Sequence, residues 1–150
     1  MSISFTVFVE NEAGSDQKNL YDEKSLEFKK SVTVSLPYPF PYGFIVDTTG
    51  GDGDNVDCFI ITDRKLKTGD TVQCKAIGMM QQTDDGEEDN NIIAVLEDEA
   101  EVLLNDEIKS RLTEFIAHVF DHRKDKIIVA GDFLDKNEAY EYLRTHQDKS

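Results

Sequence analysis

The sequence lacks the features of secreted and membrane proteins. No apolar run approaches the 18 residues of a membrane span, and Met1–Phe5 carries no basic side chain of the kind that opens a signal peptide. Tryptophan is absent, and the two cysteines, Cys58 and Cys74, lie among apolar neighbours as buried free thiols do. We therefore expect a cytoplasmic protein, and its 150 residues are enough for one domain, residues 1–150, with one core.

Basic side chains are also scarce. The chain has 16 lysines and arginines against 31 acidic residues, which gives a formal net charge of −15. A protein with this charge is repelled by phosphate backbones and by anionic lipid surfaces. The composition therefore predicts neither a nucleic-acid partner nor a membrane partner.

Acidic residues, in contrast, are concentrated in two short segments, Gly51–Asp57 and Thr83–Asp89. Each joins segments of β character, and close carboxylates on tight turns repel one another by roughly 4 kcal/mol per pair at about 4 Å. Oxygen ligands without nearby paired Cys or His favour Mg²⁺, Mn²⁺ or Ca²⁺ over zinc or copper. The two segments therefore predict a metal site made of several carboxylates.

Two other kinds of metal site are conceivable in this sequence, and the acidic segments could also be ordinary polar turns. An EF-hand loop starting at Asp52 would need Gly at its sixth position and Glu at its twelfth, where the chain has Asp57 and Asp63. His118 and His122 are four residues apart, but no HExxH pattern surrounds them. We therefore favour a carboxylate site and give the two histidines a structural role at a helix C-terminus.

The apolar pattern predicts several short strands followed by helices. Alternation indicates a strand at the start of the chain, and the polar stretch from Asn11 to Lys30 could hold a hairpin. Further strands are predicted at Val56–Thr62, Thr71–Gln82, Ile92–Leu96 and Lys126–Ala130, the first three in meander order. Helical spacing with Asn105 as N-cap predicts a long helix over about 106–122, and the capping box Asp135–Glu138 starts a short C-terminal helix. These elements predict an α+β fold with a small closed barrel flanked by helices.

The motifs of this chain resemble those of the soluble family I inorganic pyrophosphatases. YPFPYGF at residues 38–44 is followed by GGDGDNVD at 50–57, and QCKAIGMMQQTDDGEED occupies 73–89. IAHVFDHRKD at 116–125 and KIIVAGDFLDKNEAYEYL at 126–143 follow in that family's order. The resemblance implies a five-stranded OB-like barrel with outer helices, and a homo-oligomer, hexamer or dimer.

The resemblance also implies what the chain does and which residues do it. The implied reaction is hydrolysis of pyrophosphate to two phosphates by a metal-activated water, with several Mg²⁺ ions per site and Mn²⁺ as an alternative. The implied metal ligands are Glu10, Asp52, Asp57, Asp84 and Asp89. The implied catalytic residues are Asp54, which accepts the proton of the water, Tyr42 and Lys124. The implied substrate-binding residues are Lys18, Lys30, Tyr38 and Arg123.

The chain departs from that family on the cationic side of the implied site. Lys30 stands where the family usually has arginine, which keeps the charge but loses the bidentate fork, and Asn91 stands where lysine is usual. Arg123 replaces a tyrosine. These changes leave open a divergent enzyme that acts on another phosphoanhydride, or a divalent-metal-binding module without catalysis.

One acidic position near the N-terminus is also left open. Leu20 stands where the resemblance leads us to expect a second acidic residue, and either Asp22 or Glu23 could take that role.

Overall fold

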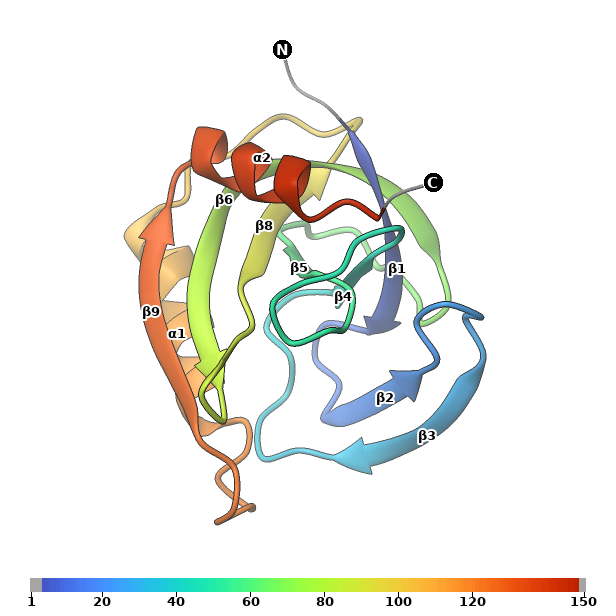
Figure 1. Ribbon diagram of the computed structural model, residues 1–150, viewed down its shortest axis with the longest axis vertical. Coiled ribbons are helices and arrows are strands. Elements are labelled where there is room, and N and C mark those ends of the chain that lie inside the picture. Colours follow the sequence, from blue (N-terminus) through green and yellow to red (C-terminus); the bar gives the residue numbers. More distant parts are fainter. Residues whose placement is uncertain (1–3, 149–150) are drawn as a thin grey trace.

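A five-stranded closed barrel forms the centre of the protein in a computed structural model that describes residues 4–148 (Figure 1). Around the barrel the strands follow the order β1-β4-β5-β8-β6, and β6 closes the ring by pairing with β1. The barrel strands are β1 Phe5–Asn11, β4 Tyr42–Ile45, β5 Asp57–Ile60, β6 Thr71–Asp84 and β8 Asn91–Leu96. The other elements are β2 Gln17–Tyr21, β3 Phe28–Thr33, β7 Glu87–Glu88, α1 Asp106–His118, β9 Ile128–Leu134 and α2 Lys136–Thr145. The α+β barrel with flanking helices is thus confirmed.

The meander order predicted for the middle strands is wrong. β5 pairs with β4 and, in parallel, with β8, so it is not a hairpin partner of β6. The physical reason is the length of β6, which pairs with β1 through its first half and with β9 through its second half while β8 lies along its other side. A strand of this length, bent at its register shifts, can pair with different strands along its two edges and so close a small barrel.

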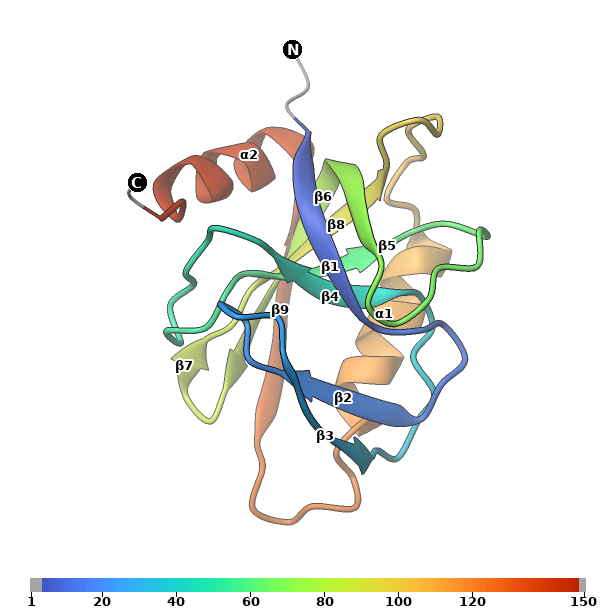
Figure 2. The same ribbon diagram turned by 90° about the vertical axis from the view of Figure 1, so that its right-hand side faces the viewer.

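Two helices and a hairpin lie outside the barrel. α1 lies behind β9 and β6, α2 lies across one end of the barrel, and the β2–β3 hairpin lies beside it, away from α2 (Figures 1 and 2). The hairpin expected between Asn11 and Lys30 is therefore present, with its second strand extended to Thr33. Among the described residues, no helix is long and apolar enough to cross a membrane.

Alternating residues of the strands face two apolar clusters. Cys58 and Ile60 point into one cluster, which α2 covers, and Phe59 points into the other, which α1 covers. Both cysteines are buried free thiols, as expected. Leu112 and Phe115 are buried on the inner face of α1. The period-two and helical patterns thus place the core as the sequence predicted.

The long helix ends at His118, four residues earlier than expected. Asn105 is its N-cap and accepts the backbone N–H of Ile108 at 2.9 Å. After Val119 the chain is held by Ser35, whose backbone N–H donates to the Val119 carbonyl at 2.8 Å and whose hydroxyl accepts the His122 N–H at 3.0 Å. These bonds draw the following residues away from the helix axis.

Gly43→Ala is expected to destabilise the fold by at least about 3 kcal/mol, as overpacking against rigid backbone does. A Cβ at Gly43 would lie 1.8 Å from the Phe8 carbonyl oxygen of the neighbouring strand. Urea unfolding measures the effect, with Gly50→Ala as control because there a Cβ meets its nearest atoms at 3.6 Å. Equal stability of the two variants would contradict the prediction.

Candidate active site

The two acidic loops meet because the strands that follow them are parallel neighbours. The first loop leads into β5 and the second into β8, and Asp57 and Asn91 are register partners at the start of these strands. Parallel strands begin at the same edge of a sheet, so the loops that precede them lie side by side. A Cβ at Gly51 would lie only 2.9 Å from the Glu88 side chain, so the two loops are in contact.

The first acidic loop is ordered by its own hydrogen bonds. The Gly50 N–H donates to the Asp54 carbonyl at 2.7 Å, and the Asp54 N–H donates to Asp52 Oδ1 at 3.0 Å. Gly53 has a φ of +88°, a conformation that favours glycine. Asp54 is exposed and Asp52 partly buried, so the two carboxylates differ in access to solvent.

Asp89 brings the second loop into electrostatic contact with the first. Burial, and next the charge of Asp89, raise the pKa of Asp57 well above its usual range. The same two causes raise the pKa of Asp52 to about 7. Three of the implied metal ligands, Asp52, Asp57 and Asp89, are therefore close enough to repel one another strongly.

Glu10 and Glu23 complete this acidic group from the side of β1 and the hairpin. Burial, and next the charge of Glu23, raise the pKa of Glu10 to about 8. Burial and then the charge of Asp54 raise the pKa of Glu23 to about 7. Glu23 Oε1 also accepts the Asn55 N–H at 3.0 Å, which ties the hairpin to the first acidic loop.

The structure thereby distinguishes Glu23 from Asp22. The Asp22 carboxylate accepts the backbone N–H groups of Ser25 and Lys24 at 2.9 and 3.0 Å, and these bonds lower its pKa. Asp22 caps its own turn, whereas Glu23 joins the acidic group. Sequence spacing cannot separate two adjacent acidic residues in a loop, because only the path of the hairpin decides which one faces the barrel.

The donor chemistry of the acidic group fits a hard divalent cation. Carboxylates with pKa values raised by one another gain stability when a cation neutralises them, and oxygen-only donors select magnesium-like ions. In the described range, 4–148, no three His, Cys, Asp or Glu side chains are already gathered at the spacing of a bound metal. Asp52, Asp57 and Asp89, whose charges act on one another, are the residues that would hold such an ion.

Aromatic rings form one wall of the same region. The Tyr38 ring lies 5.3 Å from the Tyr42 ring and 4.7 Å from the Phe115 ring, between centroids. Burial raises the pKa of both phenols, with further increases from Glu10 and Asp57, so both hydroxyls stay protonated at neutral pH. They are available as hydrogen-bond donors beside the carboxylates.

The four implied basic residues differ in how close they lie to the acidic group. Lys18 lies near Glu10, whose pKa its charge lowers, and its Nζ is 4.9 Å from the centre of the Phe120 ring. Lys30 and Lys124 are exposed, and the exposed Arg123 donates to Asp125 at 2.9 and 3.2 Å. Of these four residues, Lys18 is the one that lines the cavity between the acidic group and the aromatic wall.

Sequence reasoning missed Lys126. Its Nζ lies 2.9 Å from Asp84 Oδ1 and 3.0 Å from Oδ2, and 15% of its side chain is exposed. The antiparallel pairing of β9 with β6, in which Asp84 faces Ile128, brings Lys126 to Asp84. No local motif signals this contact, since the two residues are 42 positions apart.

The C-terminal residues also reach both acidic loops and were not expected to do so. The Tyr142 hydroxyl donates to Glu88 in the second loop at 3.1 Å, and the Thr49 N–H donates to the His146 carbonyl at 2.9 Å beside the first loop. Lys24 Nζ donates to Asn55 Oδ1 at 2.8 Å and to Asp148 Oδ2 at 3.1 Å. These contacts hold the loops to the body of the protein.

His118, the last residue of α1, and His122, which lies beyond the helix, both contact protein groups. His118 Nδ1 lies 2.8 Å from Asp121 Oδ2, and His122 Nδ1 lies 2.7 Å from the Ser35 hydroxyl. The structural role expected for them is consistent with these contacts.

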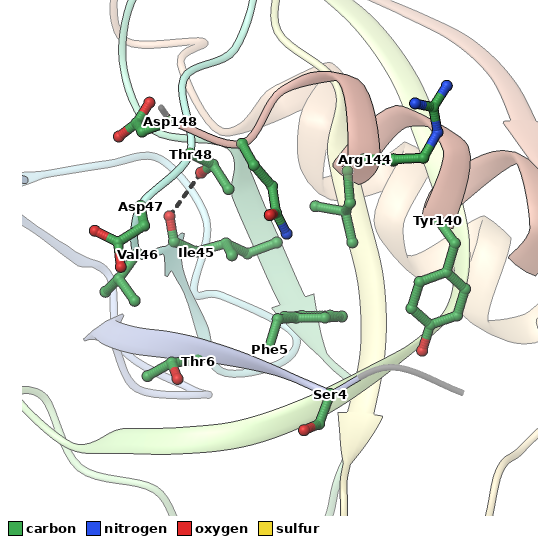
Figure 3. A pocket seen from close by; sticks show the side chains of 12 residues that line it. Ser4, Phe5, Thr6, Ile45, Val46, Asp47, Thr48, Tyr140, Arg144 and Asp148 are labelled. Carbon is green, nitrogen blue, oxygen red and sulfur yellow. Dashed lines mark hydrogen bonds between the residues drawn. The ribbon is translucent and has the colours of Figure 1, made fainter. Parts of the chain in front are cut away.

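Another cavity lies away from the candidate site. Figure 3 shows it between the start of β1 and α2, where Phe5, Ile45, Tyr140 and Arg144 line a volume of about 740 Å³. The dashed bond from the Thr48 hydroxyl to the Ile45 carbonyl, 2.7 Å long, lies at its edge. None of the candidate site residues is among the described residues that line this cavity.

Comparison with known proteins identifies the same family as the sequence motifs do. A family model described as inorganic pyrophosphatase matches residues 7–149. An inorganic pyrophosphatase of Thermoplasma volcanium is 30% identical over 93% of this chain and 89% of that protein. Soluble inorganic pyrophosphatase 1 of Arabidopsis thaliana is 32% identical over 96% of this chain and 72% of that protein.

A solved structure agrees with these relatives. The crystal structure of an inorganic pyrophosphatase from Neisseria gonorrhoeae has a TM-score of 0.86 and 26% identity, and covers 94% of this chain and 87% of that one. The family match spans both acidic loops, the tyrosine wall and the C-terminal helix. This chain belongs to the inorganic pyrophosphatase family.

Proposed function

We propose that this chain hydrolyses inorganic pyrophosphate to two phosphates and depends on Mg²⁺. The observation that carries the proposal is the meeting of the two acidic loops, where Asp89 raises the pKa values of Asp52 and Asp57. Membership of the inorganic pyrophosphatase family supplies the substrate.

Each part of the site then has a task. Glu10, Asp52, Asp57, Asp84 and Asp89 would hold the divalent ions. Such ions neutralise charge on the phosphoryl groups and make a nearby water more acidic. Asp54, exposed at the tip of its loop, accepts the proton of the attacking water. Tyr38 and Tyr42, kept protonated by their surroundings, donate hydrogen bonds to phosphate oxygens.

A second candidate is hydrolysis of another phosphoanhydride by the same chemistry. Asn91 favours it, because a neutral, buried amide stands at the start of β8 in place of the lysine that the family resemblance leads us to expect. The turnover of nucleotide and polyphosphate substrates, compared with that of pyrophosphate, separates the two candidates. A metal-binding module without catalysis would release phosphate from none of them.

Phosphate release from pyrophosphate tests the proposal directly. At mildly alkaline pH the purified protein is expected to release phosphate with Mg²⁺, to stop when a chelator is in excess, and to resume when Mg²⁺ is restored. Circular dichroism checks that the chelated protein stays folded. Release that persists without divalent metal would contradict the Mg²⁺ requirement, and Mn²⁺ is expected to replace Mg²⁺ in part.

The assembly and location of the protein stay predictions. A homo-oligomer, hexamer or dimer, is expected from the family resemblance, and a cytoplasmic location from the composition. Light scattering of the purified protein measures the first.

A further inference from the structure

A neutral asparagine, Asn91, begins β8 at the position where the family resemblance leads us to expect a lysine. Asn91 is 1% exposed, and neither its Oδ1 nor its Nδ2 has a hydrogen-bond partner among the described residues. It lines a cavity of about 40 Å³ together with Lys18, Tyr42 and Asp89, which is room for a water molecule or a ligand oxygen. A buried amide without a partner is costly, so its position here points to a polar group that enters the cavity.

Among the described residues that line this cavity, Lys18 is the one basic side chain that could contact an anionic substrate beside the divalent ions. Lys30 and Lys124 are exposed, and Arg123 is paired with Asp125. Lys126, in contrast, is largely buried, and its Nζ lies 5.0 Å from the centre of the Phe120 ring. The Nζ of Lys18 lies 4.9 Å from the same ring, and Phe120 itself lines the cavity, so both ammonium groups contact a ring at its wall.

We propose that Lys126 is a substrate-binding residue: it pairs with Asp84 in the metal-free protein and moves to a phosphate oxygen when a divalent ion takes Asp84. This inference rests on the proposed function, because it assumes a phosphate substrate and a metal ion at Asp84. With Lys18, Lys126 supplies the positive charge that position 91 lacks. Asn91 then offers a neutral hydrogen bond to the same ligand.

If Lys126 has this role, removing its charge changes the affinities for metal and for phosphate in opposite directions. An ammonium within 3 Å of Asp84 competes with a cation for that carboxylate. Loss of the ammonium therefore strengthens metal binding and weakens phosphate binding. Loss of a purely structural ion pair would leave phosphate binding unchanged, so the phosphate affinity separates the two roles.

Lys126→Met tests this, since methionine keeps an apolar stem against Phe120 and removes the charge. Without substrate, its affinity for Mn²⁺ in equilibrium dialysis is expected to rise by about threefold or more. At saturating Mg²⁺, its affinity for inorganic phosphate is expected to fall by about tenfold. Lys136→Met is the matched control, because Lys136 pairs with Glu101 at 3.3 Å outside the site and its loss should change neither affinity. Unchanged or weaker Mn²⁺ binding, or unchanged phosphate binding, in Lys126→Met overturns the inference.

A measurement on the unmodified sequence does not depend on how the variant folds. Acetic anhydride labels accessible lysines, and mass spectrometry reads the extent at Lys126. Mg²⁺ alone is expected to increase this labelling by freeing Lys126 from Asp84, and inorganic phosphate added with Mg²⁺ is expected to reduce it again. Labelling that responds to neither addition overturns the inference.

The two proposals fail separately. If the protein does not hydrolyse pyrophosphate but Lys126 labelling still responds to Mg²⁺ and phosphate, the proposed function fails and the binding role stands. If hydrolysis is normal and Lys126→Met matches the control in both affinities, the binding role alone fails.

Discussion

Asp54→Asn is expected to lower kcat for pyrophosphate by about a hundredfold to ten-thousandfold, the usual contribution of a general base. Asparagine has the shape of aspartate but cannot accept the proton of the attacking water at neutral pH. The loop itself should persist, since the Asp54 backbone rather than its side chain makes the bonds to Gly50 and Asp52.

Metal binding separates this effect from a loss of the site. The charge of Asp54 raises the pKa values of Glu10, Glu23 and Asp52, so its removal relieves repulsion and leaves the metal ligands in place. Asp54→Asn should therefore still be stabilised by Mg²⁺ in a thermal melt.

Asp63→Asn is the control for Asp54→Asn. Asp63 is exposed and lies outside both acidic loops, so the substitution makes the same change in net charge without touching the site. It should keep near-normal activity. A kcat within a few fold of normal for Asp54→Asn would assign the proton acceptor to another group.

Asp89→Asn is expected to lower the rate of pyrophosphate hydrolysis by about a hundredfold or more. The same substitution is expected to stabilise the protein at pH 8 when no metal is added. Asp89 is an implied metal ligand, and its charge raises the pKa values of both Asp52 and Asp57. Replacing it removes a ligand and a source of repulsion together. Thermal melts in chelator and phosphate-release assays with Mg²⁺ measure the two effects.

The pH dependence follows from the direction of the shifts. Asp52 has a pKa of about 7 in the folded protein against an ordinary 3.8, and Glu10 has about 8 against 4.5. The folded state therefore holds protons that the unfolded chain has lost, so without metal the stability falls as the pH rises from about 4 to about 8. Below that window these groups carry no penalty, and above it the penalty is complete. The fall should be shallower in Asp89→Asn and in the Mg²⁺-loaded protein.

Glu87→Gln is the control for Asp89→Asn, because Glu87 is an exposed acidic residue of the same loop. It should change neither the melting temperature at pH 8 nor the activity by much. An Asp89→Asn protein that is no more stable than normal at pH 8 without metal would show that the acidic group is not under the repulsion described here.

Local features of the chain could be predicted because their causes are local. The N-caps Asn105 and Asp135 accept N–H groups three residues ahead, at 2.9 Å in each helix, as the capping patterns predicted. The alternation of apolar residues indicated β1, β5, β6, β8 and β9, but not the two-residue β7 or β4, whose pattern is obscured by the prolines before it. The acidic loops are visible in the sequence as local clusters of carboxylates, and carboxylates in tight turns need a counter-charge.

The partners across the site could not be predicted in the same way. The position of Glu23 in the acidic group, the contact of Lys126 with Asp84 and that of Tyr142 with Glu88 all depend on which strand lies beside which. The predicted meander would have put β5 next to β6 and left the two acidic loops without the parallel pair that joins them.

The sequence by itself therefore indicated most of the strand and helix segments, the two acidic loops and the kind of metal that they suit. These follow from side-chain periodicity and from charge density, which act over a few residues. The tertiary structure alone decided which carboxylates lie close enough to raise one another's pKa and which lysine contacts Asp84. The parallel pairing of β5 with β8 and the pairing of β9 with β6 bring together residues far apart in the chain, and no short-range interaction encodes that choice.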